Sequence, residues 1–254
     1  MVFSIFTNHP IEIFASGLKE APWIDLSLSW LDFLKIPYER NAYSYFKVAN
    51  QKSFPGFHYT VPGDLSALAF WVVLSIIQQT NIVVHRVDLK DPQCDKIIID
   101  LIASLHVDFT YSYETQTLNL HPNAIPNGFS FDLENGIDLL PALSVLACFL
   151  KTPTHLYNGA TAKTKECNRI ECLAFELKKM GATIEVQEDG LLIFPSKLKS
   201  AHVSSHHDHR LAMALSICAV SIDGESTIDN YECVSKTYPL FFEVLESLKE
   251  HAFT

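Results

Sequence analysis

Residues 171–194 read ECLAFELKKMGATIEVQEDGLLIF and predict an amphipathic helix followed by a β-hairpin. Leu173, Leu177 and Met180 recur at spacings of three and four, which is the period of a helix with one buried face. Gly181 is a suitable helix C-cap, and the polar turn EDG separates two stretches that alternate with period two. We therefore expect a helix that ends near Met180 and two antiparallel strands after it.

The same order of helix, strand, turn and strand occurs twice upstream, at 23–48 and 94–120, and a last copy of the helix lies at 241–248. The copies are spaced by about 70 to 75 residues, which indicates duplicated structural modules. Apolar helices and short strand-like runs lie between them, so each module reads strand, helix, strand, helix, strand, strand. The sequence thus predicts an α/β fold of repeated βαβαββ units, with helices inside or against mixed sheets.

A break in the repeats falls at 51–56, where the stretch QKSFPG ends the first copy and precedes a strand expected at 57–61. We expect residues 1–54 to form one unit and residues 55–254 to form a domain of three units. Asp64 is expected to cap the apolar helix that follows.

Bulk composition limits the partners and the compartment. The 19 Lys and Arg residues against 29 Asp and Glu residues give a net charge of -10, which disfavours nucleic acid and anionic membranes as partners. No apolar run reaches the roughly 18 residues of a membrane span, and the first residues lack the pattern of a secretory signal. The 6 cysteines occur without a CxxC pair, so neither disulfides nor a zinc site is expected. We expect a cytoplasmic protein that holds any anionic ligand with a local basic cluster.

The densest polar stretch is KTKECNR at 163–169, directly before the helix of the third module. Lys165 and Arg169 at a helix start could hold a phosphate or a carboxylate, and Glu166 would be placed to exchange a proton. Taken alone, such a stretch is more often a solvated, capped helix start.

A second polar cluster, HHDHR, lies at 206–210 ahead of another apolar helix. Adjacent residues at a helix start point in different directions, so its histidines are not expected to share a metal ion. Arg210 is placed for bidentate contact with a carboxylate or phosphate. Asp138 and Lys236 also precede helices, and by themselves they read as an N-cap and a solvated loop lysine.

The order and spacing of these groups carry a resemblance to a known family. Asp138 is followed by KExxR at 165–169, DHRLAM at 208–213 and KTYPxFF at 236–242. This series resembles the 5-enolpyruvylshikimate-3-phosphate (EPSP) synthase family, whose members carry Lys-Glu-Ser/Thr-Asp-Arg, Asp-His-Arg-x-Ala-Met and Lys-Thr-Phe-Pro in this order. The resemblance covers nearly the whole chain.

The resemblance implies an EPSP synthase-like inside-out α/β barrel domain. It implies a transferase that moves the enolpyruvyl group from phosphoenolpyruvate to shikimate 3-phosphate in aromatic amino acid biosynthesis, with no metal or organic cofactor. The residues it makes catalytic are Asp138, Lys165 and Glu166. The residues it makes substrate-binding are Asp138, Thr161, Lys165, Arg169, Arg210 and Lys236.

Family members have two domains with the site between them, so this chain would correspond to the C-terminal domain plus one unit of the N-terminal domain. We expect activity to need an N-terminal half, from a separate polypeptide or a longer precursor. The stretch EAPW at 20–23 replaces the family's Ser-x-Pro-Tyr at the shikimate 3-phosphate site, which leaves substrate preference open. Two alternatives are an inactive fragment of this enzyme and an enolpyruvyl transferase acting on a UDP-sugar, which KExxR and DHR fit less well.

Overall fold

The computed structural model describes residues 1, 3, 6–17, 19–50 and 55–252. The chain divides into two compact units: unit 1 is Met1–Pro62 with Asp88–Cys94, and unit 2 is Gly63–Val87 with Asp95–Thr254. The expected boundary after residue 54 adjoins 51–54, which lie outside the described residues. The assignment of 1–54 and 55–254 to separate domains therefore stays a prediction.

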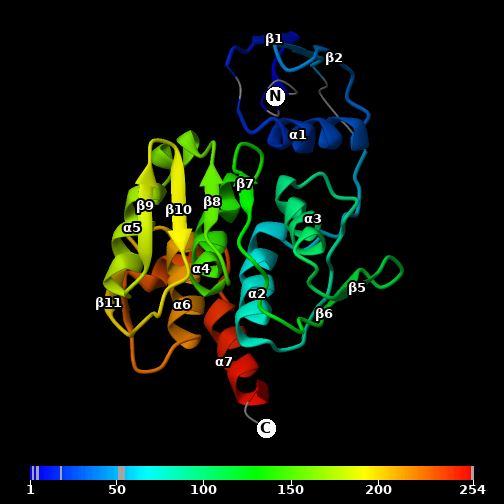
Figure 1. Ribbon diagram of the computed structural model, residues 1–254. Helices are drawn as coiled ribbons and strands as arrows, with labels where there is room; N and C mark the ends of the chain where they lie inside the picture. The colour runs from blue at the N-terminus through cyan, green and yellow to red at the C-terminus, as the bar shows by residue number, and fades with distance from the viewer. Residues whose placement is uncertain (2, 4–5, 18, 51–54, 253–254) are drawn as a thin grey trace. The chain divides into compact units, whose positions relative to one another are not determined.

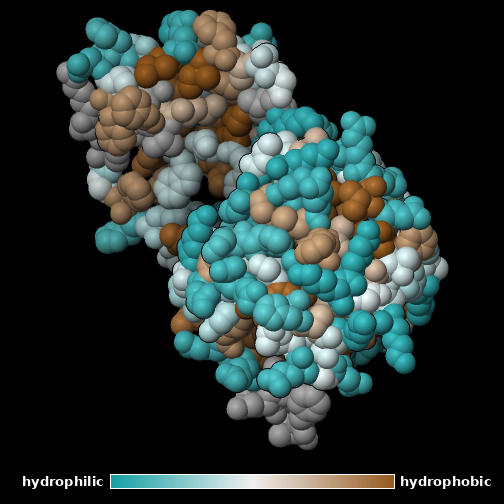
Figure 2. Space-filling model, turned by 90° about the vertical axis from the view of Figure 1, so that its left-hand side faces the viewer, coloured by the Kyte–Doolittle hydropathy of each residue, from teal (hydrophilic) through white to brown (hydrophobic). Residues whose placement is uncertain are grey.

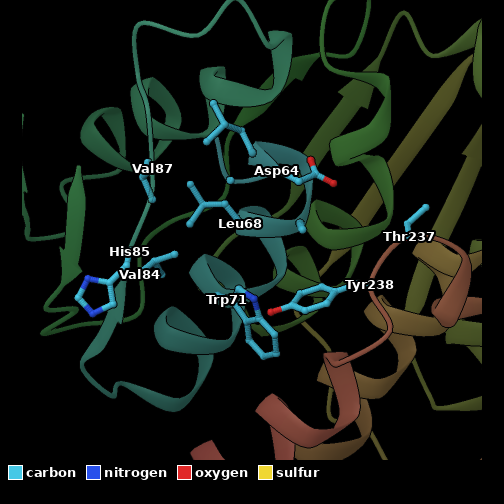
Figure 3. Close-up of a pocket in the computed structure, with 11 residues that line it drawn as sticks. Asp64, Leu68, Trp71, Val84, His85, Val87, Thr237 and Tyr238 are labelled. Carbon is cyan, nitrogen blue, oxygen red and sulfur yellow. The ribbon is translucent and has the colours of Figure 1, made fainter. Parts of the chain in front are cut away.

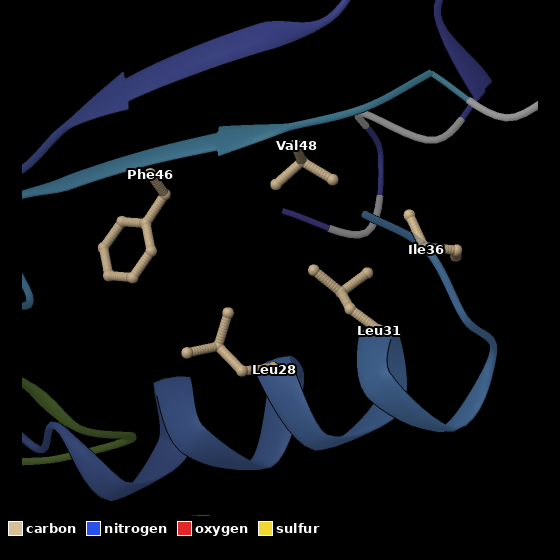
Figure 4. Packing of buried hydrophobic residues seen from close by; sticks show 5 residues of the cluster. All are labelled: Leu28, Leu31, Ile36, Phe46 and Val48. Carbon is tan, nitrogen blue, oxygen red and sulfur yellow. The ribbon is translucent and has the colours of Figure 1, made fainter. Parts of the chain in front are cut away.

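Unit 1 contains a three-stranded antiparallel sheet covered by one helix. The strands follow the order β1-β3-β2, with bounds Ile11–Phe14 (β1), Tyr45–Val48 (β3) and Tyr38–Asn41 (β2). Helix α1 (Pro22–Phe33) turns Leu28 and Leu31 toward Phe46 and Val48 of β3 (Figure 4). Because one helix covers one short sheet, the buried core of this unit is small.

The described part of unit 2 holds three sheets. The first is antiparallel, in the order β4-β6-β5 (Ile82–Val84, Thr117–Leu120, Phe109–Ser112). The second has the order β7-β8-β10-β9 (Ser130–Asp132, Thr154–Tyr157, Gly190–Phe194, Thr183–Gln187), with only β7 and β8 parallel. The third pairs β11 (His202–Ser204) in parallel with β12 (Thr227–Asp229).

Three apolar helices, α2 (Leu65–Gln78), α4 (Leu140–Phe149) and α6 (His209–Val220), contact one another within unit 2 (Figure 1). Their residues are apolar on every side, and most of them are buried, as expected for helices surrounded by other elements. The remaining helical segments are α3 (Ile97–Ser104), α5 (Arg169–Lys179), α7 (Phe241–Ala252) and the short 3-10 helices η2 (Cys94–Lys96), η3 (Ile137–Leu139), η4 (Ala160–Thr164) and η5 (Tyr231–Lys236). None of the described helices combines the length and apolar character that crossing a membrane requires.

The structure confirms the predicted α/β fold class and the helix-plus-hairpin module. Helix α5 ends at Lys179, and the hairpin β9–β10 follows, with Leu191 paired to Val186. Gly181 has a φ of 96°, the left-handed backbone that a helix C-cap favours. The other modules are α1-β2-β3 and α3-β5-β6.

The strand expected at 57–61 is wrong, because these residues adopt no regular structure. Phe57 and Tyr59 instead pack against Trp30 and Phe33 of α1 in tilted and edge-to-face arrangements, with ring centroids 4.6 to 6.2 Å apart. Ring packing therefore holds this segment in place of strand pairing. The expected helix cap is confirmed, since the Oδ1 of Asp64 accepts a hydrogen bond from the backbone N–H of Ser66 at 2.9 Å.

Candidate active site

Arg169 lies at the centre of the polar groups that the sequence singled out. It is the first residue of α5, and its side chain is 1% exposed. Its Nε donates to the Oδ2 of Asp208 at 2.6 Å, its Nη1 to the Oδ1 of Asp138 at 2.7 Å, and its Nη2 to the Oε2 of Glu166 at 2.8 Å. A buried guanidinium is thus satisfied by three carboxylates from three different segments.

Two further cations share these carboxylates. The Nη2 of Arg210 lies 3.2 Å from the Oδ2 of Asp138, and the Nζ of Lys236 lies 3.4 Å from the Oε1 of Glu166. The structure therefore brings Arg169, Arg210 and Lys236 together: Arg169 shares Asp138 with Arg210 and Glu166 with Lys236. The exposed fractions of these side chains rise from 1% for Arg169 to 12% for Arg210 and 64% for Lys236, so the network runs from the interior to the surface.

The electrostatic surroundings keep the network ionised. Burial raises the pKa of Asp138, but Arg210, Arg169 and Lys165 lower it by more, so its pKa lies below the ordinary value. The pKa of Glu166 is also lowered: burial opposes this, while its own backbone N–H, Arg169 and His209 favour the charged form. Burial lowers the pKa of Arg169, but Asp208 and Asp138 raise it above its usual range.

The ionised side chains of the network and of Lys165 carry a net positive charge. Four cations, Arg169, Arg210, Lys236 and the nearby Lys165, face three carboxylates, which leaves one positive charge in excess. A small anion that reaches the exposed end of the network would therefore be attracted locally, despite the negative charge of the whole chain.

His209 is buried beside Glu166. Its Nδ1 is 3.5 Å from the Oε1 of Glu166 without hydrogen-bond geometry, and this buried nitrogen has no hydrogen-bond partner. Burial and then Arg210 lower the pKa of His209, so the ring is neutral near pH 7. A neutral imidazole can accept a proton, so the chemistry of this pair allows proton exchange between His209 and Glu166 if the two groups come within hydrogen-bond distance.

The two remaining predicted residues, Lys165 and Thr161, differ in how they relate to the network. Lys165 acts on Asp138 through its charge. Thr161 lies in η4, where its carbonyl accepts a hydrogen bond from the Thr164 hydroxyl, and the network's hydrogen bonds among the described residues do not include it. The N-cap interpretation of Asp138 is wrong: Leu139 precedes α4, and the carboxylate of Asp138 turns to the two arginines.

Asp208 has a role that was not predicted from the sequence. Its buried carboxylate caps α6 by accepting hydrogen bonds from the N–H groups of Arg210 and Leu211, and it also binds Arg169. The motif DHR contained the signal, because an Asp before an apolar helix is a preferred N-cap. Of the alternative interpretation of 163–169 as a solvated, capped helix start, the cap is confirmed, since Asn168 accepts from the N–H of Glu171 at 3.4 Å, whereas the buried Arg169 contradicts the solvated part.

The three neighbouring histidines do not converge. His206 pairs with Glu176 at 2.7 Å, whereas His209 faces Glu166. Within the described part of the chain, no set of three or more His, Cys, Asp and Glu side chains is arranged to hold a metal ion. The expectation of a metal-free site stays a prediction.

A cavity of about 250 Å³ lies beside the two residues that follow Lys236. Thr237 and Tyr238 form one wall, and Leu68 and Trp71 of α2 form another (Figure 3). The rings of Trp71 and Tyr238 meet edge to face with centroids 6.0 Å apart. This packing fixes the backbone immediately after Lys236.

The fold and this network define an α/β protein with a cluster of paired cations and carboxylates, and comparison with known proteins identifies the family. Residues 1–245 match the family described as EPSP synthase (3-phosphoshikimate 1-carboxyvinyltransferase), and the chain belongs to this family. The 3-phosphoshikimate 1-carboxyvinyltransferase of Chlamydia muridarum is 41% identical over 243 residues, covering 94% of this chain and 54% of that protein. The protein of the same name from Chlamydia felis is 42% identical over 234 residues, covering 91% and 51%.

Solved structures share the fold. EPSP synthase from Acinetobacter baumannii superposes with a TM-score of 0.81 at 22% identity, covering 96% of this chain and 57% of that one. The enolpyruvyl transferase NikO from Streptomyces tendae gives a TM-score of 0.76 at 16% identity, covering 98% and 57%. The chain spans about half the length of the relatives it matches.

Proposed function

We propose that this chain carries the C-terminal half of a transferase that moves the enolpyruvyl group from phosphoenolpyruvate to shikimate 3-phosphate in aromatic amino acid biosynthesis. The observation that carries the proposal is the network in which Arg210 and Lys236 meet Asp138 and Glu166 around the buried Arg169. Relatives at 41% identity bear the name of this activity.

Phosphoenolpyruvate presents a phosphate and a carboxylate, and cations near the surface are the groups that can receive them. Arg210 and Lys236 fit this role, because each is held only by one carboxylate in the contacts above and both are more exposed than Arg169. Arg169 contributes by fixing Asp138 and Glu166, and it contacts substrate only if it releases one of them. When substrate binds, its anionic groups thus replace protein carboxylates as the partners of these cations.

This exchange prepares Glu166 for acid catalysis. When a substrate anion takes Lys236, Glu166 loses a cation and gains a negative neighbour, so its pKa rises from its lowered value. A protonated Glu166 can then give a proton to C3 of phosphoenolpyruvate while the 5-hydroxyl of shikimate 3-phosphate adds to C2 and passes its own proton to the ionised Asp138. Loss of a proton from C3 to Glu166 and departure of phosphate from C2, with the proton held by Asp138, complete the transfer.

Asp138 and Lys165 complete the acceptor side of the proposed site. Asp138 is ionised and lies beside Lys165, so the pair offers one acceptor and one donor for the hydroxyls of the shikimate ring. Thr161 in the neighbouring η4 is proposed as a further contact, because its side chain carries a hydroxyl that can both donate and accept.

The proposed enzyme needs the part of the family fold that this chain does not span. Unit 1 has a small core, and Figure 2 shows apolar side chains, in brown, at its surface. Phe14 is 77% exposed, Phe33 45% and Phe57 46%. An N-terminal half, whether contiguous or separate, would cover this apolar surface and close the site against water.

Phosphate release tests the proposal. The chain is assayed with phosphoenolpyruvate and shikimate 3-phosphate, alone and after mixing with the N-terminal half of the Chlamydia muridarum relative. We expect negligible release alone and clear release from the mixture. A UDP-sugar acceptor serves as the matched comparison: release with it in place of shikimate 3-phosphate would contradict the proposed acceptor, and no release with either would support an inactive fragment.

A further inference from the structure

The turn that connects β11 to α6 adopts a costly backbone conformation. His206 and His207, both within this turn, have φ values of 52° and 59°. Residues other than glycine are disfavoured in this left-handed region and persist there only where the surrounding structure holds them. The turn leads directly into Asp208 and Arg210, so whatever holds it also sets the direction of these two site residues.

Glu176 holds this turn from helix α5. Its side chain is fully buried, and both carboxylate oxygens are used. Its Oε1 lies 2.7 Å from the Nε2 of His206, and its Oε2 accepts from the backbone N–H of Ser204 at 3.1 Å and from the Nζ of Lys179 at 2.7 Å. One buried carboxylate thus binds both Ser204, the last residue of β11, and His206, the first left-handed residue of the turn.

Helix α5 fastens the turn at two points. Arg169 and Glu176 are seven residues apart, which places them on one face of the helix and about 10 Å apart along its axis. Arg169 binds Asp208 at the end of the turn, and Glu176 binds Ser204 and His206 at its start. Two fixed points define both the position and the angle of the segment between them.

The same turn is tied to the segment that ends at Lys236. The N–H of Ser205 donates to the carbonyl of Asp229 at 3.0 Å, and its hydroxyl donates to the carbonyl of Asn230 at 3.0 Å. Asn230 directly precedes η5, whose last residue is Lys236. The turn therefore connects the three segments that supply Arg169, Arg210 and Lys236.

We propose that Glu176 is a positioning residue of the site: through His206 and the Ser204 amide it sets the β11–α6 turn, and so aims Asp208 and Arg210 at Arg169 and Asp138. The effect of this positioning on phosphoenolpyruvate binding rests on the proposed function. A role in stability alone does not call for this arrangement, because burying a carboxylate costs free energy that an apolar side chain of similar size would avoid.

Matched variants separate positioning from general loss of charge. Glu176→Gln keeps the shape of the side chain but removes its charge, so Lys179 and the Ser204 amide donate to a neutral oxygen, and His206 keeps its bond only as the tautomer that accepts from the new amide. His206→Gln removes the imidazole that pairs with Glu176. Because the His206 side chain is partly exposed, this variant is less harmful to folding. Glu171→Gln removes the same charge from the exposed face of the same helix and serves as the control.

The first readout is the Nε–H signal of Arg169 in nitrogen-15 NMR of the chain. The sequence has four arginines, so the signals are few, and this N–H donates to Asp208 at 2.6 Å. Under conditions where circular dichroism shows the same folded fraction, we expect Glu176→Gln and His206→Gln to speed its hydrogen exchange by about tenfold through local opening. The double variant should add little to either single one, because the pair acts as a unit.

The second readout is the KM for phosphoenolpyruvate, measured against kcat by phosphate release after mixing with the N-terminal half. We expect Glu176→Gln to raise this KM about tenfold with a smaller change in kcat, because the Arg210 side chain is no longer held in the position that binds phosphoenolpyruvate. An unchanged Arg169 signal in both variants, or an equal change in Glu171→Gln, would overturn the positioning role. If the wild-type mixture is inactive while the Arg169 signal responds as expected, the positioning role stands and the proposed function fails.

Discussion

At the scale of single residues, the burial of Arg169 decides how the site is built. A guanidinium removed from water is tolerated only when charged partners surround it, and Asp208, Asp138 and Glu166 supply them. These carboxylates then lie within reach of Arg210 and Lys236, so the organisation of the interior also arranges the cations nearer the surface.

Asp208→Asn tests this organisation. The variant keeps the helix cap, because asparagine caps as well as aspartate, but it removes the most deeply buried of the three counter-charges of Arg169. We expect a loss of about 3 to 5 kcal/mol in the free energy of unfolding, measured by urea denaturation. The control is Asp229→Asn, whose exposed pair with His202 should matter little; equal losses in both variants would contradict the account.

The lowered pKa values predict a loss of stability in two stages as the pH falls. The unfolded chain protonates His209 near pH 6.5, whereas the folded chain does so only at lower pH, so stability begins to fall below about pH 6.5. Asp138 and Glu166 contribute stability that is present above about pH 4 and is lost as the pH falls through their lower folded values.

Urea midpoints measured from pH 3 to 8 check this expectation. Comparing the wild type with His209→Gln isolates the first stage, because the other histidines are common to both chains. The variant should flatten the decline between about pH 6.5 and 5 and leave the carboxylate stage in place. An identical decline in the two chains would show that His209 has the same pKa folded and unfolded.

The sequence predicted which residues meet but not how they meet. The motif strings placed Arg169, Arg210 and Lys236 at helix ends, and the structure brings them together. Nothing in the string KECNR indicates that its arginine is 1% exposed, because burial depends on segments that lie 31 and 39 residues away in the sequence. For the same reason, Asp138 read as a helix cap and the anchoring role of Asp208 was missed.

At the scale of elements, periodicity predicted the helices and hairpins well, because the spacing of apolar residues reports local geometry. It failed at 57–61, where alternating apolar residues indicate a strand but two rings, Phe57 and Tyr59, pack on α1 instead. A strand also needs a partner, and the local pattern carries no information about one.

Gly190 shows how closely the strands of the second sheet approach. A Cβ added at this position would lie 1.9 Å from the carbonyl oxygen of Leu156 on β8. We expect Gly190→Ala to lower the free energy of unfolding by about 1 to 3 kcal/mol in urea titrations, because the hairpin must shift. Gly56→Ala meets nothing within 4 Å and is the control, so an equal effect there would contradict this packing argument.

At the scale of the whole molecule, the two units differ in how completely they bury their apolar side chains. Unit 2 encloses three apolar helices, whereas unit 1 exposes Phe14, Phe33 and Phe57 around a small core. Unit 1 is therefore the part whose stability should depend most on the additional half proposed above.

Hydrogen exchange tests this dependence. Adding the N-terminal half of the relative should slow exchange of the amides of α1 by about tenfold or more, since a bound partner stabilises the state it binds. The amides of α4, which lie in the buried centre of unit 2, provide the internal control. Equal slowing in both helices, or none in α1, would show that unit 1 is not the contact surface.

The central claim is that Arg210 and Lys236 bind phosphoenolpyruvate in a site completed by another half. The most direct test is phosphate release by the mixed halves, comparing Arg210→Ala and Lys236→Ala with Lys151→Ala, an exposed lysine outside the network. We predict losses of about 100-fold or more for the first two variants and none for Lys151→Ala. Full turnover by Arg210→Ala and Lys236→Ala, or by the chain without its other half, would contradict the account.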